Sequence, residues 1–218
     1  MIKENKRILM ITSLIILLPM FVGLLLWNQL PEQVPVHFNS EGIADSYQSK
    51  LWGVVFVYLL VFACHWFAAI ITSVDPRRRN ISSKIYRLVL WICPVISIFM
   101  GIVIYGTALK WPWVNVNVMA NLVVGVIFVF TGNYLPKCRQ NYTIGIKLPW
   151  TLSDEENWDK THRFAGKIWM LCGILEIIAG FLPIDRFEIV TIVLILLATI
   201  PIAVYSYLLY RKKMHGQR

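Results

Sequence analysis

Two titratable side chains, His65 and Glu176, lie within long apolar stretches of this sequence. Ionisable groups at membrane depth are rare and by default indicate a function, because the burial of their charge is costly. A glutamate–histidine pair can pass a proton or gate a change of shape, and each partner relieves the cost of burying the other. The alternative is a structural pair, in which a neutral carboxyl and a neutral imidazole hold two helices together by a hydrogen bond.

The positions of these residues along their helices favour a meeting. At about 1.5 Å per residue, His65 lies about 21 Å below the outer end of its helix, and Glu176 lies about 18 Å below the same membrane face. Glu176 also lies on a helix face that is open to close packing, because three glycines recur there every seven residues: Gly166, Gly173 and Gly180. We therefore expect both side chains to point into one helix bundle and to be able to meet.

The composition indicates what positions these side chains. Of 218 residues, 57% are hydrophobic and 15% are charged, and the mean hydropathy is +0.62. These values exclude a soluble domain and predict an all-α integral membrane protein with about six spanning helices of roughly 20 residues. The first run exceeds the apolar region of a signal peptide, which has about 7–15 residues, so we expect an uncleaved anchor. The predicted spans are 8–27, 51–72, 85–109, 118–135, 168–183 and 189–210.

The basic residues are unevenly divided between the two sides of these spans. Of the 21 Lys and Arg, three lie in the amino tail, five between the second and third spans, six between the fourth and fifth, and four in the carboxyl tail. The opposite side holds only Lys50, Lys110 and Arg186. This bias predicts that both termini are cytoplasmic. The net charge of +9 is thus a topology signal, and without a dense basic face we expect no direct binding of nucleic acid.

The predicted spans form two three-helix halves, and each half contains one long polar connection. Residues 1–110 form the amino-terminal half with an outer loop at 28–50, and residues 111–218 form the carboxyl-terminal half with a cytoplasmic loop at 136–167. The sequences NQLP and NYLP open these loops on opposite sides of the membrane, as in a 3+3 inverted repeat. Because transporters often have such a repeat, one hypothesis is a small proton-coupled transporter or exporter that uses the buried glutamate–histidine pair.

The outer loop is a candidate outward-facing binding element. Its start is rich in proline and therefore extended, and Asn39 to Gly42 is a turn signal. His37, Glu41 and Asp45 match no known spacing of metal ligands. We expect these three side chains to be solvated, and we predict no metal and no cofactor.

The cytoplasmic loop has more specific local sequence. The residues SDEE at 153–156 match a capping box with Ser153 as the N-cap, which predicts a short helix. Trp158, His162 and Ala165 follow at helical spacing and form an amphipathic stripe that leads to the fifth span. The aromatic residues of the loop are either anchors at the membrane interface or, with the whole loop, a docking surface for a cytosolic partner.

Enzymatic function is not predicted. The sequence contains no P-loop, GxSxG, HExxH, CxxC or GxGxxG, and its few histidines do not cluster. The four cysteines form no disulfide framework, and Cys138, which stands alone beside the fourth span, is expected to be an unmodified thiol.

Three strings resemble the SdpI family of bacterial immunity and signalling proteins: LPEQVPVHFNSEGIADSYQSK at 30–50, DPRRRN at 75–80 and GNYLPKCRQNYTIGIKLPWTLSDEENWDKTHRFAGK at 132–167. The resemblance covers nearly the whole chain. It implies a multi-pass protein of the bacterial cell membrane that protects a cell from its own secreted toxic peptide, the sporulation-delaying killing factor. It also implies that the protein signals by holding a small winged-helix repressor at the membrane.

The resemblance implies two binding regions for other molecules. Besides these partners, we expect contact with membrane lipids. The toxic peptide would contact the outer loop, with candidates His37, Phe38, Asn39 and Asp45. The repressor would contact the cytoplasmic loop, with candidates Arg139, Asn141, Tyr142, Lys147, Trp150, Trp158, His162 and Arg163. One departure is Lys147-Leu148 before Pro-Trp, where the family favours Arg-Thr; the loss of a guanidinium and a hydroxyl could alter the choice of partner.

Overall fold

The computed structural model describes residues 1–182 and 187–216. Pro183, the predicted end of the fifth span, and the two basic residues Arg186 and Arg218 lie outside the described residues. Within the described part, six helices are long and apolar enough to cross a membrane, which confirms the predicted number of spans. Their bounds are Lys3–Leu25, Trp52–Ser73, Ser83–Ala108, Val116–Lys137, Glu155–Phe181 and Glu188–His215.

Several spans combine two helical elements. The first joins η1 (Lys3–Asn5) to α1 (Lys6–Leu25), the second joins the π-helical η2 (Trp52–Phe56) to α2 (Val57–Ser73), and the fourth joins α4 (Val116–Tyr134) to η4 (Leu135–Lys137). The third span is α3 (Ser83–Ala108), the fifth is α6 (Glu155–Phe181), and the sixth comprises α7 (Phe187–Leu197) and α8 (Ile200–Gly216). The connections contain η3 (Arg78–Asn80) and α5 (Pro149–Ser153).

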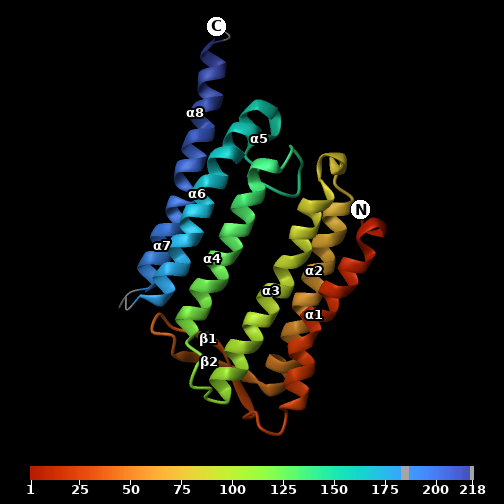
Figure 1. Ribbon diagram of the computed structural model, residues 1–218, viewed down its shortest axis with the longest axis vertical. Coiled ribbons are helices and arrows are strands. Elements are labelled where there is room, and N and C mark those ends of the chain that lie inside the picture. Colours follow the sequence, from red (N-terminus) through yellow and green to blue (C-terminus); the bar gives the residue numbers. More distant parts are fainter. Residues whose placement is uncertain (183–186, 217–218) are drawn as a thin grey trace.

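The helices form two groups (Figure 1). α1, α2 and α3 pack together, whereas α4 packs on α6, which also contacts α7 and α8. α3 and α4 are neighbours across the boundary between the groups. We call the end of the bundle where α1 begins and α8 ends the terminal face, and the opposite end the hairpin face. The 3+3 inverted repeat stays a prediction.

The six spans are helical as predicted, and the outer loop adds an unpredicted antiparallel hairpin on the hairpin face. β1 (Gln33–Phe38) pairs with β2 (Ala44–Ser49). The predicted turn is confirmed, because Gly42 has a φ of +74° and Asn39 Oδ1 accepts hydrogen bonds from the N–H groups of Glu41 and Ile43. Val34, which is fully buried, packs where only a glycine fits in the helix below: a Cβ on Gly53 would lie 2.2 Å from the Val34 side chain.

Glycines bring α4 and α6 into backbone contact. A Cβ on Gly173 would lie 2.7 Å from the Gly125 carbonyl oxygen, and a Cβ on Gly166 would lie 2.7 Å from the Gly132 carbonyl oxygen. Larger residues would force the helices apart, which is why small residues favour close packing in membranes. The predicted glycine face of the fifth span is therefore confirmed.

The predicted N-cap at Ser153 is wrong. Asp154 occupies this position, and its carboxylate accepts a hydrogen bond from the Glu156 N–H at 3.2 Å. Ser153 instead ends α5, a short helix that begins at Pro149, where a missing N–H costs nothing. α6 then continues from Glu155 into the membrane, so the predicted short helix and the fifth span are one element.

Candidate functional site

The tip of the hairpin contacts the start of α4. Asn117 Nδ2 donates a hydrogen bond to the Ser40 carbonyl at 3.3 Å, and a Cβ on Gly42 would lie 3.1 Å from the Asn117 side-chain oxygen. Because the hairpin connects α1 to α2, this contact joins the first group of helices to the second on the hairpin face.

Two adjoining cavities lie beside this contact. A polar cavity of about 350 Å³ lies between the hairpin tip and the α3–α4 connection, and its lining includes Glu41 and Lys110. An apolar cavity of about 240 Å³ lies between α3 and α4, and Phe38 lines it together with other apolar side chains. Val116 lines both. A polar entrance beside an apolar groove suits an amphipathic ligand.

Of the four predicted toxin-binding residues, Phe38 lines the apolar cavity. His37 and Asp45 are exposed and hydrogen-bonded to each other, with 2.6 Å between Nδ1 and Oδ1. The Asn39 side chain builds the turn instead of facing a cavity. Across the described residues, no three His, Cys, Asp or Glu side chains gather where they could hold a metal ion.

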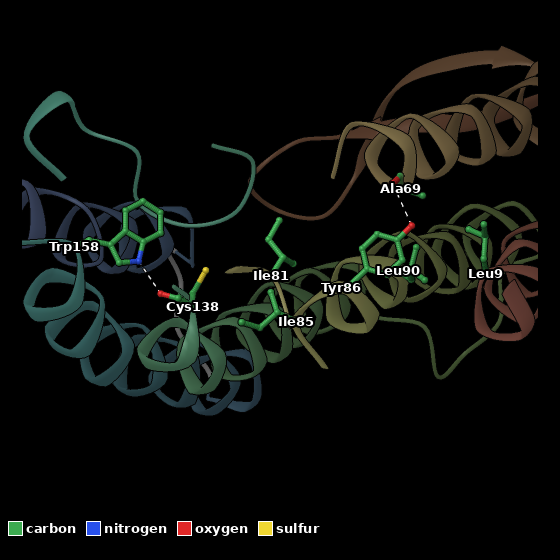
Figure 2. Close-up of a cluster of buried hydrophobic side chains, with 8 residues drawn as sticks. All are labelled: Leu9, Ala69, Ile81, Ile85, Tyr86, Leu90, Cys138 and Trp158. Atoms are coloured by element: carbon green, nitrogen blue, oxygen red, sulfur yellow. Dashed lines mark hydrogen bonds between the residues drawn. The ribbon is translucent and has the colours of Figure 1, made fainter. Parts of the chain in front are cut away.

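On the terminal face, residues 138–148 fold around buried polar side chains. Asn141 Oδ1 accepts hydrogen bonds from the N–H groups of Thr143 at 3.0 Å and Ile144 at 2.7 Å, and its Nδ2 donates to the Arg139 carbonyl at 2.8 Å. Trp158 Nε1 donates to the Cys138 carbonyl at 2.6 Å (Figure 2). These bonds fix the start of the loop against α6.

His162 fixes the end of the same loop. Its Nε2 accepts a hydrogen bond from the Ile146 N–H at 2.9 Å, and its Nδ1 donates to the Trp158 carbonyl at 2.7 Å. The ring must be neutral to make both bonds, because a proton on Nε2 would face the Ile146 N–H. Gly145, with a φ of +115°, allows this approach, since a Cβ there would lie 2.4 Å from Nε2.

Three of the predicted docking residues therefore cannot contact a partner directly. Asn141, Trp158 and His162 are at most 1% exposed and form the interior of the loop, as their bonds to backbone groups require. The amphipathic stripe of Trp158, His162 and Ala165 is confirmed as buried. Trp150 is half-buried and donates a hydrogen bond to Ser206. The remaining candidates are exposed: Arg139, Tyr142, Lys147 and Arg163.

The loop is also joined to the α2–α3 connection. The Asp75 carboxylate, 1% exposed, accepts hydrogen bonds from the Tyr142 N–H at 2.9 Å and the Thr143 hydroxyl at 2.8 Å. The Arg77 guanidinium donates to the Gln140 side chain and lies 4.8 Å from the centre of the Tyr142 ring. Asn80 Nδ2 donates to the Gln140 carbonyl at 2.7 Å. We call this set the terminal-face bridge: Asp75, Arg77, Asn80, Gln140, Tyr142 and Thr143.

Sequence reasoning did not single out Asp75 or Gln140. The available signal was the Asp-Pro dipeptide directly after the second span, which marks a turn in which an aspartate binds nearby backbone. Here Asp75 Oδ1 accepts a hydrogen bond from the Arg77 N–H at 2.6 Å, which leaves its second oxygen free to reach the other loop.

Cys138 and Trp158 belong to one buried apolar cluster with Ile81 of the α2–α3 connection and Ile85 of α3 (Figure 2). Burial raises the pKa of the Cys138 thiol from 9.0 to about 11, against a smaller lowering by the hydrogen bond from Asn141. The thiol is therefore neutral at physiological pH and a poor nucleophile.

The predicted pairing of His65 with Glu176 is wrong, although both side chains are buried in the bundle as expected. His65 Nε2 lies 3.1 Å from Thr12 Oγ1 of α1. The Thr12 hydroxyl donates to the Ile8 carbonyl at 2.8 Å, so the imidazole is the donor in this contact. α2 packs against α1 and α3, while α6 packs against α4, α7 and α8, so the two residues belong to different helix groups.

Glu176 instead joins three helices. Thr191 Oγ1 of α7 lies 2.6 Å from Glu176 Oε1 and 3.1 Å from Asn121 Oδ1 of α4. One hydroxyl proton cannot serve both oxygens. A protonated Glu176 satisfies the arrangement, because its O–H donates to Thr191 and Thr191 then donates to Asn121. The geometry thus fits a neutral, structural carboxyl.

Comparison with known proteins relates these regions to a family. Residues 137–206 match the model of the SdpI/YfhL protein family. The resemblance to the SdpI family is thereby confirmed. Residues 14–62 match a domain of unknown function, DUF1648. The chain is 26% identical over 213 residues to "Immunity protein SdpI" of Bacillus subtilis (strain 168). The aligned region covers 95% of this chain and 98% of that protein. No solved structure matches the chain.

The two matched segments contain the two regions described above. The SdpI segment holds the terminal-face loop, α5, α6, α7 and the first part of α8, and the other segment holds most of α1, the hairpin and the start of α2. With its six spans and this similarity, the chain is a multi-pass bacterial membrane protein.

Proposed function

We propose that this chain is a membrane immunity protein that protects a bacterium against a secreted toxic peptide. The observation that carries the proposal is the similarity to an immunity protein along 95% of the chain. The excess of Lys and Arg on the terminal face supports a cytoplasmic location for both termini, which leaves the hairpin outside, where a secreted peptide arrives.

The peptide site lies on the hairpin face. A peptide that attacks membranes is amphipathic, and the adjoining cavities offer an apolar groove beside a polar entrance that holds one acidic and one basic side chain. Phe38 lines the groove and belongs to the hairpin, which is joined to both helix groups. A ligand that displaces Phe38 therefore affects both groups. Binding there needs no catalytic chemistry.

The cytoplasmic partner is a small winged-helix repressor that docks on the exposed part of the terminal-face loop. Arg139, Lys147 and Arg163 supply positive charge on this surface, and Tyr142 supplies an aromatic anchor. Residues 1–110 and 111–218 act as two halves. A few polar contacts join them, at the hairpin tip on one face and at the terminal-face bridge on the other. A peptide bound beside the hairpin tip changes the relative position of the two halves.

Proton-coupled transport is less well supported than binding. The transport hypothesis needs a carboxyl that exchanges its proton, whereas the Glu176 carboxyl is hydrogen-bonded to Thr191, which is also hydrogen-bonded to Asn121. Its predicted proton partner, His65, is bonded to another helix. Both groups serve as contacts between helices.

Immunity is tested by survival. A bacterium sensitive to the sporulation-delaying killing factor expresses this chain and is challenged with the purified peptide. We expect protection by the native chain and at least about a tenfold loss of tolerated peptide concentration in Phe38→Ala, because a buried aromatic anchor contributes about 2 kcal/mol or more. Tyr47→Ala is the matched control, since Tyr47 is 51% exposed on β2 and lines neither cavity.

The absence of protection by native protein that is verified in the membrane would reject immunity to this peptide. Equal effects of Phe38→Ala and Tyr47→Ala would reject the site. Repressor docking is tested separately by Arg139→Ala, Lys147→Ala and Arg163→Ala in one chain. This variant should abolish derepression of a reporter while protection persists.

A further inference from the structure

A third cavity lies between α3 and α4 on the side of the terminal face. It has a volume of about 570 Å³, within the range of small-molecule sites. Its walls are largely apolar, from Trp91, Val95 and Val126 among others. Trp91 is 42% exposed and Phe130 is 56% exposed, so the cavity is flanked by side chains that face lipid. This crevice is where the two helix groups meet without filling the space between them.

Two cations line the terminal end of the crevice. Lys84 and Arg87 lie on the first turns of α3, and no acidic residue is among the residues that line the crevice. Arg87 Nε donates to the buried Asn5 side chain at 2.9 Å, which holds the guanidinium in place. Within the described residues neither cation forms an ion pair, so both keep their charge available to a ligand.

The length of the crevice matches one leaflet of a bilayer. From Lys84 to Val95 the α3 axis rises by about 16 Å, at about 1.5 Å per residue. Half of a hydrocarbon core of about 30 Å is about 15 Å. The cations therefore lie at headgroup depth, and the apolar walls extend along one acyl chain. Thr131 and Tyr134 add hydroxyl groups along the α4 wall.

We propose that this crevice binds an anionic glycerophospholipid of the terminal-face leaflet, with its phosphate on Lys84 and Arg87 and one acyl chain between α3 and α4. Positive charge at the ends of spans also sets topology, but topology alone requires no adjoining crevice. The bound lipid fills the boundary between the helix groups and so becomes part of the packed structure.

The test is native mass spectrometry of the purified chain titrated with dioleoyl phosphatidylglycerol or dioleoyl phosphatidylcholine. Each Lys or Arg near an anionic surface contributes about a fivefold gain, so two predict a preference of roughly 25-fold for phosphatidylglycerol. Lys84→Gln with Arg87→Gln should reduce this preference to within about threefold of equality. Lys167→Gln, an exposed cation of α6 outside the crevice, should leave it unchanged.

Val126→Trp tests the acyl site while both cations remain. It should fill the crevice and weaken phosphatidylglycerol binding by about tenfold or more. Equal binding of the two lipids to the native chain would overturn the proposal whatever the variants do. An unchanged phosphatidylglycerol affinity in Val126→Trp would overturn the crevice as the site. If Lys167→Gln lost as much of the preference for phosphatidylglycerol as the Lys84→Gln, Arg87→Gln variant, general surface charge would explain the preference and the proposal would fail.

Discussion

Replacement of Asp75 by Asn should weaken the terminal-face bridge while the volume of the side chain is kept. The carboxylate accepts three hydrogen bonds, at 2.6 Å from the Arg77 N–H, 2.9 Å from the Tyr142 N–H and 2.8 Å from the Thr143 hydroxyl. Asn offers one oxygen and places an NH₂ group where the second oxygen was. If the oxygen remains with Arg77, the Thr143 hydroxyl can turn to accept, but the Tyr142 N–H has no acceptor.

The magnitude follows from these bonds. The loss of a hydrogen bond to a charged group costs about 1.5–3 kcal/mol, and a buried donor without an acceptor costs about 1–3 kcal/mol. Because these costs overlap, we expect the free energy of unfolding to fall by about 2–4 kcal/mol. With about 2–4 °C of melting temperature per kcal/mol in chains of 150–250 residues, the midpoint should fall by roughly 4–16 °C.

The assay is thermal unfolding in detergent micelles, followed by the fluorescence of the nine tryptophans. Asp159→Asn is the matched control, because Asp159 is exposed on α6 and makes no side-chain hydrogen bond within the described residues. It should shift the midpoint by less than about 2 °C, as surface substitutions usually do. A midpoint for Asp75→Asn equal to that of Asp159→Asn would refute a structural role for the bridge.

Three further predictions concern the interior. Gly173→Leu should prevent folding, because its Cβ alone would lie 2.7 Å from the Gly125 carbonyl; size-exclusion chromatography would then show aggregates, whereas Ile174→Leu, on the exposed face, should elute as native protein. Glu176→Gln should retain protection against the peptide, since its amide can still donate to Thr191, whereas loss of protection at normal expression would favour the transporter. Cys138 should react with maleimide at pH 7 at least tenfold more slowly than in denatured protein, and rapid labelling at pH 7 would contradict its burial. Because burial raises the pKa of its thiol from 9.0 to about 11, the contribution of the neutral thiol to stability is complete below pH 9 and is lost as the pH approaches 11.

The parts of the fold that depend on local composition could be predicted from the sequence. Apolar runs of sufficient length define the six spans, and glycines seven residues apart define the face of α6 that packs on α4. The hairpin was missed, although its turn was recognised. Its signal was the alternation of Val34, Val36 and Phe38 with other residues in a short polar loop, which is weak beside the helical pattern around it.

The failed pairing of His65 with Glu176 has a different cause. Residue counts give the depth of each group in the membrane, but depth does not say which helices are neighbours. Thr12 and Thr191, the actual partners, are ordinary residues of apolar helices and carry no signal of their role. Two of the docking candidates are buried for a similar reason, because Asn141 and His162 bind backbone groups, whose positions appear only in the folded loop.

The boundary between α3 and α4 is where the binding proposals converge. Within each group the helices are held firmly, by polar contacts such as that of His65 with Thr12 and by the glycine contacts of α4 with α6. Between the groups, the hairpin tip and the terminal-face bridge make the polar contacts, and cavities lie along α3 and α4 between them. A peptide that enters at Phe38 therefore acts on an interface that contains cavities, and the loop proposed to hold the repressor lies at the opposite end of that interface. This arrangement predicts that Asp75→Asn, which weakens the bridge, impairs signalling more than protection.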